Sequence, residues 1–547
     1  MPIQRNILVI ALLVVTFFIY QKWNEQNTYT NQQKNNISQV GSSKSGHIPN
    51  IDENSTNNIT NQAEKLVTIT TDKVIFKINL YGGDIVYAKL INLQPTGKDR
   101  TFQLLQNTNN AYIAQSGLIG KNGIDSNTNK TRPLFSSQSS NYTLKGDSLS
   151  VPITYTKDGI TYIKTFIIKK DSYAVDVNYD IKNNSGTTAN LAMYTQIKKS
   201  ENQPSGGLKS YAMPVYQGTA YSDQEHNYKK YSFSDIKDTN LNITTNTGWI
   251  AMLQHYFVTA WVPHLNKNQS GKIYTTSNNG YAYIGFMYPS VSIPNDQSAT
   301  IKSTLWIGPK IQNAMEKVAP HLNLTIDYGW LFFIAKPLHW LFLKIHSLVS
   351  NWGLVIIIFT LLVRGAMYPL TRAQYTSMAK MKMLQPKIEE MKARVGDDRQ
   401  KMSQEMMALY KREKVNPLGG CLPLLIQMPI FIAFYWVLME SYQLRGAPFF
   451  GWITDLSNHD PLYILPLLMG GTMFLIQKMS PTTVTDPMQQ KIMTFMPIVF
   501  TAFFFMMPSG LVLYWVTSNL ATLTQQFIIF RSLEKKGLHT RKAKNKK

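Results

Sequence analysis

The chain has 547 residues, too many for one compact core, so its sequence predicts two or more structural units. Its formal net charge of +23 favours anionic partners such as lipid headgroups, RNA or acidic substrates, although the same charge also suits a membrane protein with a basic cytoplasmic side. The single cysteine, Cys421, excludes an intramolecular disulfide framework and any CxxC zinc or redox site.

An apolar segment at residues 7–20 comes first, with Arg5 before it and Lys22 after it. A cleaved signal peptide would need a small-residue cleavage motif after this segment, and the sequence has none there. We therefore predict an uncleaved transmembrane anchor over residues 1–23. Residues 24–62 are rich in Asn, Gln and Ser and predict a flexible tether.

Residues 63–310 alternate between apolar and polar side chains in many short runs, separated by Gly, Asn and Asp turns. Two of these runs are Val74, Phe76, Ile78 and Leu80, and Val175, Val177, Tyr179 and Ile181. Such alternation predicts strands, and the number of runs predicts a large, all-β antiparallel sandwich domain.

Residues 311–350 predict two helices that link this domain to the rest of the chain. The first is a short helix at 311–318. The second, at 330–345, is rich in aromatic residues, but Lys336, Pro337 and His339 interrupt its middle. We therefore expect an amphipathic helix that lies in the membrane interface and does not span the bilayer.

Five apolar segments follow, at residues 352–370, 419–442, 462–477, 492–507 and 510–530. With the anchor they predict an α-helical polytopic membrane protein of six transmembrane helices, five of them in a core over residues 351–530. The connecting segment 371–417 and the tail 531–547 are basic, which places both in the cytoplasm with the N-terminus, and the β domain outside. A span of about 16 helical residues covers only about 24 Å, so these spans predict a locally thinned bilayer.

Arg364 lies inside one of these apolar segments, where a guanidinium stays charged and is costly to bury. Thr360 lies one turn earlier on the same helix face, and Gln427 lies in the middle of the next span. The last span is unusually polar, with Tyr514, Trp515, Thr517, Ser518, Asn519, Thr522, Thr524, Gln525 and Gln526. If these faces converge, they line a water-accessible groove that holds one fixed positive charge. The alternatives are that Arg364 reaches the cytoplasmic headgroups and that the other residues make ordinary interhelical hydrogen bonds.

The segment 371–417 predicts a cytoplasmic hairpin of two helices, broken at Gly396-Asp397-Asp398, with Asp397 as the N-cap of the second helix. The hairpin is rich in methionine, whose side chain adapts to many apolar partners. These residues are Met378, Met381, Met383, Met391, Met402, Met406 and Met407. They predict contacts with variable hydrophobic clients, or else they fill the core of the hairpin. The basic tail, which includes Lys542, suits either ribosomal RNA or anionic lipid.

Motifs of known enzyme classes are missing from the sequence: it has no P-loop, no G-x-S-x-G, no H-E-x-x-H and no paired histidines on one helix face. We therefore expect no enzymatic activity, no cofactor and no bound metal. His255 and His264 are isolated in the β domain, and we interpret them as structural.

Seven strings of the C-terminal half carry a resemblance: 363–365 (VRG), 368–375 (YPLTRAQY), 413–421 (EKVNPLGGC), 425–431 (LIQMPIF), 478–482 (KMSPT), 485–491 (TDPMQQK) and 508–514 (PSGLVLY). Together they closely resemble the YidC family of bacterial inner-membrane insertases, within the Oxa/Alb superfamily. The upstream layout, one anchor and then a large periplasmic domain, is similar to the Gram-negative form of this family.

The resemblance implies a five-helix core with a hydrophilic groove, open to cytoplasm and lipid but closed on the outer side. The groove arginine of the family corresponds to Arg364 and its neighbouring threonine to Thr360. The substrate-contacting face of the last helix corresponds to Tyr514 and Trp515, where the family more often has tyrosine at the second position. The loop around Asp486 and the basic tail would lie near the ribosome. The β domain would resemble a galactose-mutarotase-like sandwich without its sugar chemistry.

The expected function is that of a membrane protein insertase and chaperone that uses no nucleotide and acts alone or with the Sec translocon (SecYEG and SecDF). Its other expected partners are nascent membrane proteins, the ribosome and inner-membrane lipids. Two other classes stay open at this point. A secondary transporter or anion channel would suit a lone intramembrane cation, and a scaffold subunit of the secretion channel would suit the large β domain.

Overall fold

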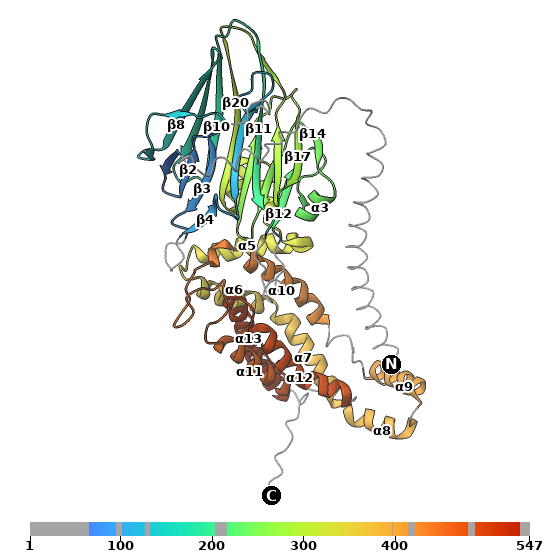
Figure 1. Ribbon diagram of the computed structural model, residues 1–547. Helices are drawn as coiled ribbons and strands as arrows, with labels where there is room; N and C mark the ends of the chain where they lie inside the picture. The colour runs from blue at the N-terminus through green and yellow to red at the C-terminus, as the bar shows by residue number, and fades with distance from the viewer. Residues whose placement is uncertain are drawn as a thin grey trace.

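The computed structural model describes residues 65–93, 101–125, 132–202, 216–396, 398–413, 422–479 and 487–535. The predicted anchor at 1–23, the tether at 24–62, and the predicted contact residues Asp486 and Lys542 lie outside these ranges. The described chain forms a β domain joined to a helical body, and helix α5 (Phe332–His346) lies between the two (Figure 1).

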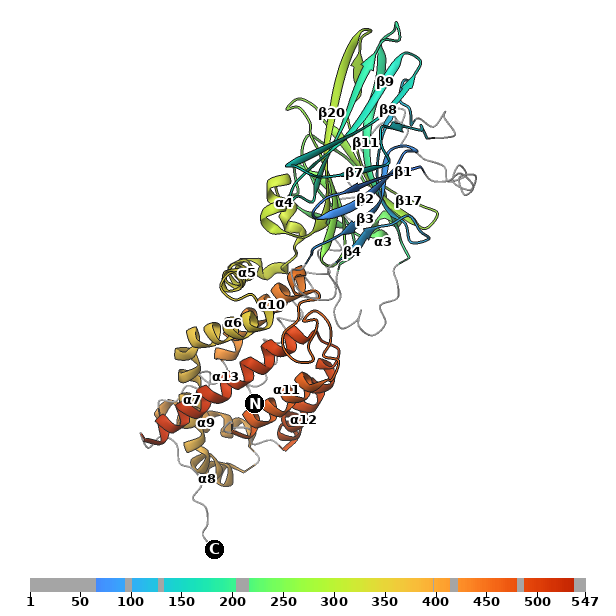
Figure 2. The ribbon, with the colours of Figure 1, turned by 90° about the vertical axis from the view of Figure 1, so that its left-hand side faces the viewer.

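The β domain contains two large sheets, in agreement with the alternating sequence pattern (Figure 2). The strands of the first sheet are β1 (Leu66–Thr70), β2 (Val74–Asn79), β3 (Asp84–Leu90), β4 (Phe102–Leu105), β5 (Tyr112–Ile119), β7 (Asn141–Thr143), β11 (Ala189–Ser200), β14 (Asn242–Thr245), β17 (Gly271–Asn278), β18 (Tyr281–Met287) and β19 (Val291–Ile293). Within the described ranges they pair in the order β14-β17-β18-β11-β5-β3-β2-β1-β7, with β4 on β3 and β19 on β11. The pairs are antiparallel except for β1 with β7.

The second sheet lies against the first. Its strands are β6 (Ser136–Ser137), β8 (Ser148–Lys157), β9 (Ile160–Lys169), β10 (Ala174–Asn183), β12 (Gly218–Ser222), β13 (Lys229–Tyr231), β15 (Trp249–Leu253), β16 (Phe257–Pro263) and β20 (Gln297–Pro309). They pair in the order β13-β12-β15-β16-β20-β10-β9-β8-β6. A short helix, α3 (Phe233–Asp238), precedes β14.

The core of this domain is apolar and strongly aromatic. The four apolar residues predicted to face inward from β10 are 0–4% exposed, which confirms the alternation read from the sequence. Trp249, Trp261 and Trp306 are also fully buried in the core. Burial of such side chains, at about 25 cal/mol per Å² of apolar surface, is the main source of stability for a domain without a disulfide.

A buried cluster of charges links the two sheets inside the sandwich. Arg132 Nε donates a hydrogen bond to Asp125 Oδ1 at 2.9 Å, and the same guanidinium pairs with Asp84 at the start of β3. From the second sheet, Lys164 Nζ donates to the Gly83 carbonyl oxygen at 2.6 Å. Burial lowers the pKa of Lys164 to about 7. Each charge in this cluster therefore depends on its partners, because water cannot replace them.

Replacing Arg132 with Met should lower the free energy of unfolding by about 3–5 kcal/mol, because Asp84 and Asp125 would stay buried without their cation. Urea unfolding of the purified protein, followed by tryptophan fluorescence, measures this loss. As a control, Lys73→Met removes the more exposed ion pair with Asp171 and should cost about 1 kcal/mol or less. Equal losses in the two variants would contradict the importance of the buried cluster.

The link between the two parts contains the predicted short helix, α4 (Gln312–Val318), followed by two 3-10 turns, η3 (Leu322–Thr325) and η4 (Gly329–Leu331). The predicted helix at 330–345 is α5, but it starts at Phe332, because the chain turns through η4 at Gly329, whose φ is 59°.

Helix α5 is apolar on both of its faces. It buries Ala335, His339, Phe342 and Ile345, which recur every three to four residues. The outer face carries Phe333 and Trp340, which are 58% and 62% exposed. Exposed aromatic side chains of this kind are typical of a helix at a membrane surface.

The helical body contains α6 (Trp352–Ala366), α7 (Tyr368–Met383), α8 (Gln385–Val395), α9 (Arg399–Arg412), α10 (Leu422–Glu440), the 3-10 turn η6 (Tyr442–Leu444), α11 (Ile464–Met479), α12 (Pro487–Phe504) and α13 (Ser509–Lys535). Helix α13 packs against both α6 and α11, and α5 packs against α6 and α10. The long last helix therefore lies at the centre of the body (Figure 2).

The predicted segment at 352–370 is not one straight helix. Helix α6 ends at Ala366, α7 begins at Tyr368, and the two helices are bent by 60°. Pro369 explains the break, because it lacks the N–H that would bond to the Gly365 carbonyl oxygen in a continuous helix.

The predicted hairpin differs from expectation in two ways. Its first arm is two helices, α7 and α8, because Pro386 removes the next helical hydrogen bond, to Lys382. The N-cap of α9 is Asp398, whose side chain accepts hydrogen bonds from two backbone N–H groups of the first turn. The predicted cap, Asp397, lies outside the described residues. Gly396 has a φ of 65°, as expected for a residue that ends a helix.

By length and hydropathy alone, no single helix in the described ranges qualifies as a membrane span, and α6 with α7 qualifies only as a bent pair.

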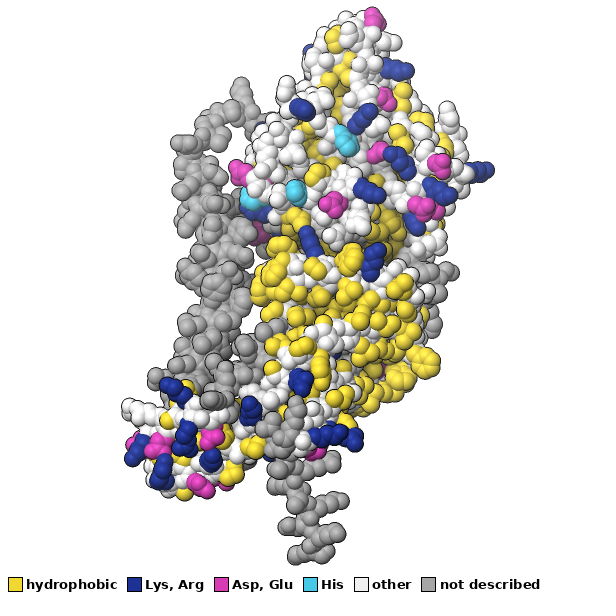
Figure 3. All heavy atoms as spheres, turned by 180° about the vertical axis from the view of Figure 1, so that it is seen from behind, with side chains coloured by type: hydrophobic (Ala, Val, Ile, Leu, Met, Phe, Trp, Pro, Cys, Tyr) yellow, Lys and Arg dark blue, Asp and Glu magenta, His cyan; other side chains and the backbone are white. Residues whose placement is uncertain are grey.

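Exposed apolar side chains gather on the helical body. They lie between the charged surface of the β domain and that of the α8–α9 hairpin (Figure 3). Examples that are at least half exposed are Leu361 on α6, Leu467 and Phe474 on α11, and Phe495 and Val499 on α12. A patch of this extent does not suit a surface that faces water.

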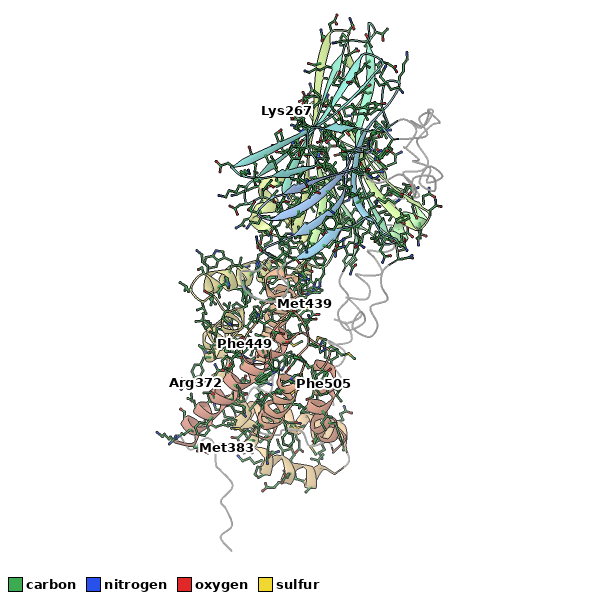
Figure 4. The ribbon with its side chains drawn as sticks, turned by 60° about the vertical axis from the view of Figure 1, so that its left-hand side comes forward. Lys267, Arg372, Met383, Met439, Phe449 and Phe505 are labelled. Carbon is green, nitrogen blue, oxygen red and sulfur yellow. The ribbon has the colours of Figure 1, made fainter. Side chains whose placement is uncertain are left out.

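The β domain is fastened to the end of α10. Lys310, just after β20, pairs with Glu440 at 3.2 Å, and the two side chains are only 3% and 7% exposed. His255, in the turn between β15 and β16, donates from Nε2 to the carbonyl oxygen of Met439 at 2.8 Å. Figure 4 shows Met439 at this junction. The last turn of α10 is thus bonded to the domain by both side chain and backbone.

His255 makes the junction sensitive to pH. Its burial, together with the nearby charge of Lys310, lowers the pKa of the imidazole from 6.5 to about 4. Between these values the unfolded chain binds a proton that the folded chain does not. The contribution of His255 to stability is therefore fully present above pH 6.5 and is lost as the pH falls toward 4.

When the pH is lowered from about 7 to about 5, the melting temperature of the His255→Gln variant should fall less than that of the parent protein. Melting temperatures of the detergent-solubilised protein at several pH values check this. If the melting temperature of His255→Gln falls with pH as steeply as that of the parent, the assignment of the proton to His255 is wrong.

Candidate functional site

Arg364 lies in the last turn of α6, and its side chain is partly buried in the helical body. The helix begins at Trp352 because the side chain of Asn351 caps it, accepting a hydrogen bond from the backbone N–H of Leu354 at 3.1 Å. The run of Val, Ile, Leu and Phe that follows has no helix breaker before Gly365. A cation in the last turn of a helix is favoured by the helix dipole.

Within the described residues, three hydrogen bonds hold the guanidinium, and each of their acceptors is neutral. Arg364 Nε donates to Ser518 Oγ on α13 at 2.8 Å, and Nη2 donates to the same oxygen. Nη1 donates to Oε1 of Gln427 on α10 at 3.1 Å. The backbone carbonyl of Arg364 accepts a bond from Gln525 Nε2 on α13 at 2.9 Å. We call Arg364, Gln427, Ser518 and Gln525 the arginine cluster; it joins α6, α10 and α13.

The positive charge of this cluster is held but not neutralised. A guanidinium has five N–H donors, and the hydrogen bonds above use three of them. One donor on each terminal nitrogen stays without a partner within the described part of the chain. No ion pair between Arg364 and a carboxylate of the described residues is present within 4 Å. The arrangement can therefore attract an anion and offer it two hydrogen-bond donors.

Two of the predicted groove residues do not join the arginine cluster. Thr360 is buried, and its hydroxyl donates to the Ile356 carbonyl oxygen of its own helix at 2.6 Å. Asn519 faces α11, where its Nδ2 donates to Thr472 Oγ1 at 3.0 Å. For Asn519 the structure favours the alternative that the sequence left open, an ordinary interhelical hydrogen bond.

Tyr514 and Trp515 belong to a layer of aromatic rings on the side of the arginine cluster that is nearer the β domain. The ring centre of Tyr514 lies 4.9 Å from that of Phe434, and Trp515 meets Phe431 edge to face at 4.5 Å. Phe434 in turn stacks on Phe359 of α6 at 4.0 Å. These rings fill the space between α6, α10 and α13, so the polar cluster is bounded by apolar packing on this side.

The hairpin methionines divide between surface and core. Met391 is 6% exposed and lies in the contact between α8 and α9, which favours the interpretation that it fills the hairpin. Met378, Met381, Met402 and Met406 are partly exposed. Two others named in the sequence, Met383 and Met407, are 48% and 44% exposed.

Helix α7 is packed against the end of α13. Tyr375 and Ala379 of α7 form a small buried cluster with Ile529, Phe530 and Leu533, and Met378 lies at its edge. The start of the hairpin is thereby fixed to the helical body.

The sequence did not identify Ser518 and Gln525 as partners of Arg364. Both are among the polar residues of the last span, but no feature distinguished them from the others. Their spacing carried a usable signal, because residues seven apart lie on one face of a helix. Asn519, which the sequence predicted as a groove residue, points about 100° away from Ser518 on that helix.

Replacing Ser518 with Ala should lower the stability of the helical body by about 1–3 kcal/mol, because two guanidinium donors lose their acceptor. Thermal unfolding in detergent measures this. Thr524→Ala on the same helix is the matched control, because its hydroxyl is exposed and bonds only within α13; it should change stability by less than about 0.5 kcal/mol. Equal shifts would show that Ser518 does not support the cation.

An exposed apolar helical body attached to a large β sandwich is typical of a membrane protein with an extramembrane domain. Two family models match the chain: the YidC periplasmic domain over residues 66–341 and the 60Kd inner membrane protein over residues 344–536.

Two relatives named Membrane protein insertase YidC match almost the whole chain. The relative from Actinobacillus succinogenes is 53% identical over 546 residues, which are 99% of each protein. The relative from Aliivibrio salmonicida is 54% identical over 554 residues, covering 99% of this chain and 100% of the relative. The chain belongs to the YidC family of membrane protein insertases.

Solved structures add little to this conclusion. A crystal structure of an active YidC insertase with its first transmembrane domain resolved covers 85% of this chain and 92% of its own, with 19% identity and a TM-score of 0.37. A galactose mutarotase-like protein from Lactobacillus casei covers 44% and 99%, with 9% identity and a TM-score of 0.31. Neither score is high enough to carry an argument, so the mutarotase-like fold of the β domain stays a prediction.

Family membership confirms the resemblance read from the motifs and the expected insertase function. It makes the chain an inner-membrane protein with a periplasmic domain, from a family of insertases rather than of enzymes. The two alternatives, a transporter or channel and a scaffold of the secretion channel, find no support in these comparisons.

Proposed function

We propose that this insertase uses the arginine cluster to draw the polar or acidic flanks of nascent membrane proteins into a hydrated groove among α6, α10 and α13. The observation that carries the proposal is the guanidinium of Arg364, which has neutral acceptors on two helices and two donors to spare. A client carboxylate would use those two donors, and the water of the groove would weaken the attraction enough for the client to leave again.

The proposed membrane topology has six spans, with both termini and the hairpin in the cytoplasm. The belt of exposed apolar side chains on α6, α11 and α12 supports a lipid-facing body. The basic residues of the hairpin and tail support their cytoplasmic position. Helix α11 has 16 residues and reaches only about 24 Å, which supports a thinned bilayer at the groove.

The energy for insertion comes from the client in this proposal. Burial of its apolar segment in lipid contributes about 25 cal/mol per Å². The membrane potential adds about 2.3 kcal/mol per charge and 100 mV for a negative flank moving outward. The groove and the thinned bilayer lower the barrier, and no nucleotide is required.

The outer end of the groove would be closed by the aromatic layer. Tyr514 is buried within it and Trp515 lies at its edge, so we assign to these two side chains the contact with the apolar part of a client. Thr360, buried one turn before Arg364, would support the groove wall and not bind the client directly.

The hairpin would receive clients first. Its partly exposed methionines, Met378, Met381, Met402 and Met406, suit variable apolar segments. We further propose the ribosome, the Sec translocon (SecYEG and SecDF) and anionic inner-membrane lipids as partners. The basic tail with Lys542 and the loop around Asp486 would face the ribosome.

Arg364→Ala should slow insertion of a client with an acidic N-terminal flank by about tenfold, because one charge-assisted contact of about 1.5 kcal/mol or more is lost. Insertion into proteoliposomes that contain only this protein measures the rate, by protection of the flank from protease. Arg364→Lys is the matched control: it keeps the charge and should retain part of the activity. A client with a neutral flank should be much less affected. Unimpaired insertion of the acidic client by Arg364→Ala would refute the role of the charge.

A further inference from the structure

We propose that Lys310 and Glu440 are positioning residues, through which the periplasmic β domain fixes the outer end of α10 and thereby sets where Gln427 meets Arg364. The functional part of this inference rests on the role proposed above for the arginine cluster. Its geometric part concerns α10 alone and can be tested without any insertion assay.

The contact between Lys310 and Glu440 fixes the position of the β domain relative to the end of α10. Both side chains are almost completely buried, and their charged atoms are 3.2 Å apart. Compared with apolar packing, a buried ion pair adds little stability, but it strongly disfavours any arrangement in which one charge loses its partner. Sliding of the β domain over the helical body would separate these two buried charges.

Two further contacts hold the same end of α10, and they come from both sheets. His255 donates to the carbonyl oxygen of Met439, one of the last carbonyls of the helix. After the helix, the Arg445 guanidinium lies 4.8 Å from the ring centre of Phe102, which itself stacks on Phe257 at 4.1 Å. The end of α10 is therefore held from several directions and not by one flexible side chain.

The link from the β domain into α5 reinforces this attachment. Asp327 pairs with Lys230 of β13, and its side chain also accepts a hydrogen bond from the N–H of Gly329 at 2.8 Å. Turn η4 and helix α5, which follow, both pack against α10. The β domain thus contacts α10 directly at the end of the helix. It also supports α10 along its length, through η4 and α5.

Helix α10 connects the two sites physically. Gln427 and Glu440 are thirteen positions apart, or about 20 Å along the helix. Between them, Ala433, Phe434 and Val437 are fully buried, so this part of the helix moves only together with its neighbours. Phe434 also contacts Tyr514 in the aromatic layer. A shift at the outer end would therefore reach both the aromatic layer and the arginine cluster.

Spin-label distances in the full-length protein test this inference, and the single native cysteine makes them simple. In a Cys421→Ser background, one label pair at Met428→Cys and Leu520→Cys reports on α10 against α13; both side chains are about half exposed. A second pair, at Lys267→Cys and Phe450→Cys, reports on the β domain against the helical body; Figure 4 labels Lys267 far out on the domain.

Lys310→Met should broaden and shift the distances of both label pairs. The reversed pair, Lys310→Glu with Glu440→Lys, should restore them, which a purely stabilising role would not require. Glu440→Gln is the milder variant and gives the same readout if Lys310→Met does not fold. Arg132→Met is the matched control, because it breaks a buried ion cluster of the β domain away from α10; it should leave the 428–520 distance unchanged.

An unchanged 428–520 distance in Lys310→Met and Glu440→Gln would overturn the inference, as would an equal change in Arg132→Met. Insertion of the acidic-flank client by the same variants separates this inference from the proposed function. Altered distances with a severalfold loss of insertion support both. Altered distances with normal insertion would leave the positioning of α10 established and would count against the role of the arginine cluster.

Discussion

A guanidinium cannot give up its proton in a protein, so an arginine that is partly withdrawn from water must be solvated by the chain around it. In this protein the solvation of Arg364 is supplied by a hydroxyl and an amide from two other helices. That requirement explains why α6, α10 and α13 meet where they do, and why the last helix is polar in a body that is otherwise apolar. A carboxylate partner would have solvated the charge more strongly, but it would also have cancelled it. Neutral acceptors keep the cation in place and leave its charge uncompensated.

The rest of the helical body surrounds this polar centre with apolar material. Aromatic rings pack on the side toward the periplasm, and aliphatic side chains cover the outer surface of α6, α11 and α12. The β domain also contributes to this arrangement, because it binds the end of α10, the helix that carries Gln427. If insertion needs no nucleotide, as proposed above, the geometry of the resting state matters most.

The sequence predicted those features that depend on local pattern. Alternation in β2 and β10 marked their strands, and the apolar run around Arg364 marked an internal cation, because these signals need only neighbouring residues. The structure differs where proline acts: Pro369 and Pro386 each end a helix that hydropathy alone would continue. The partners of the cation were not singled out, although their spacing places Ser518 and Gln525 on one face of α13. The choice between Ser518 and Asn519 depends on the rotation of α13 about its axis, which is set by packing against α6 and α11 and leaves no trace in composition. The same holds for Lys310 and Glu440, which lie 130 positions apart in the chain.

The small cluster of Tyr375 and Ala379 with the end of α13 has a mechanical consequence. It anchors α7 to the body, so the base of the hairpin is fixed. The helix is next interrupted at Leu384, because Pro386 follows, and we expect any motion of the outer arm to hinge there. Helix α8 has 11 residues, so its far end would move on a radius of about 16 Å. In the function proposed above, a client held there would stay within that distance of the end of α7.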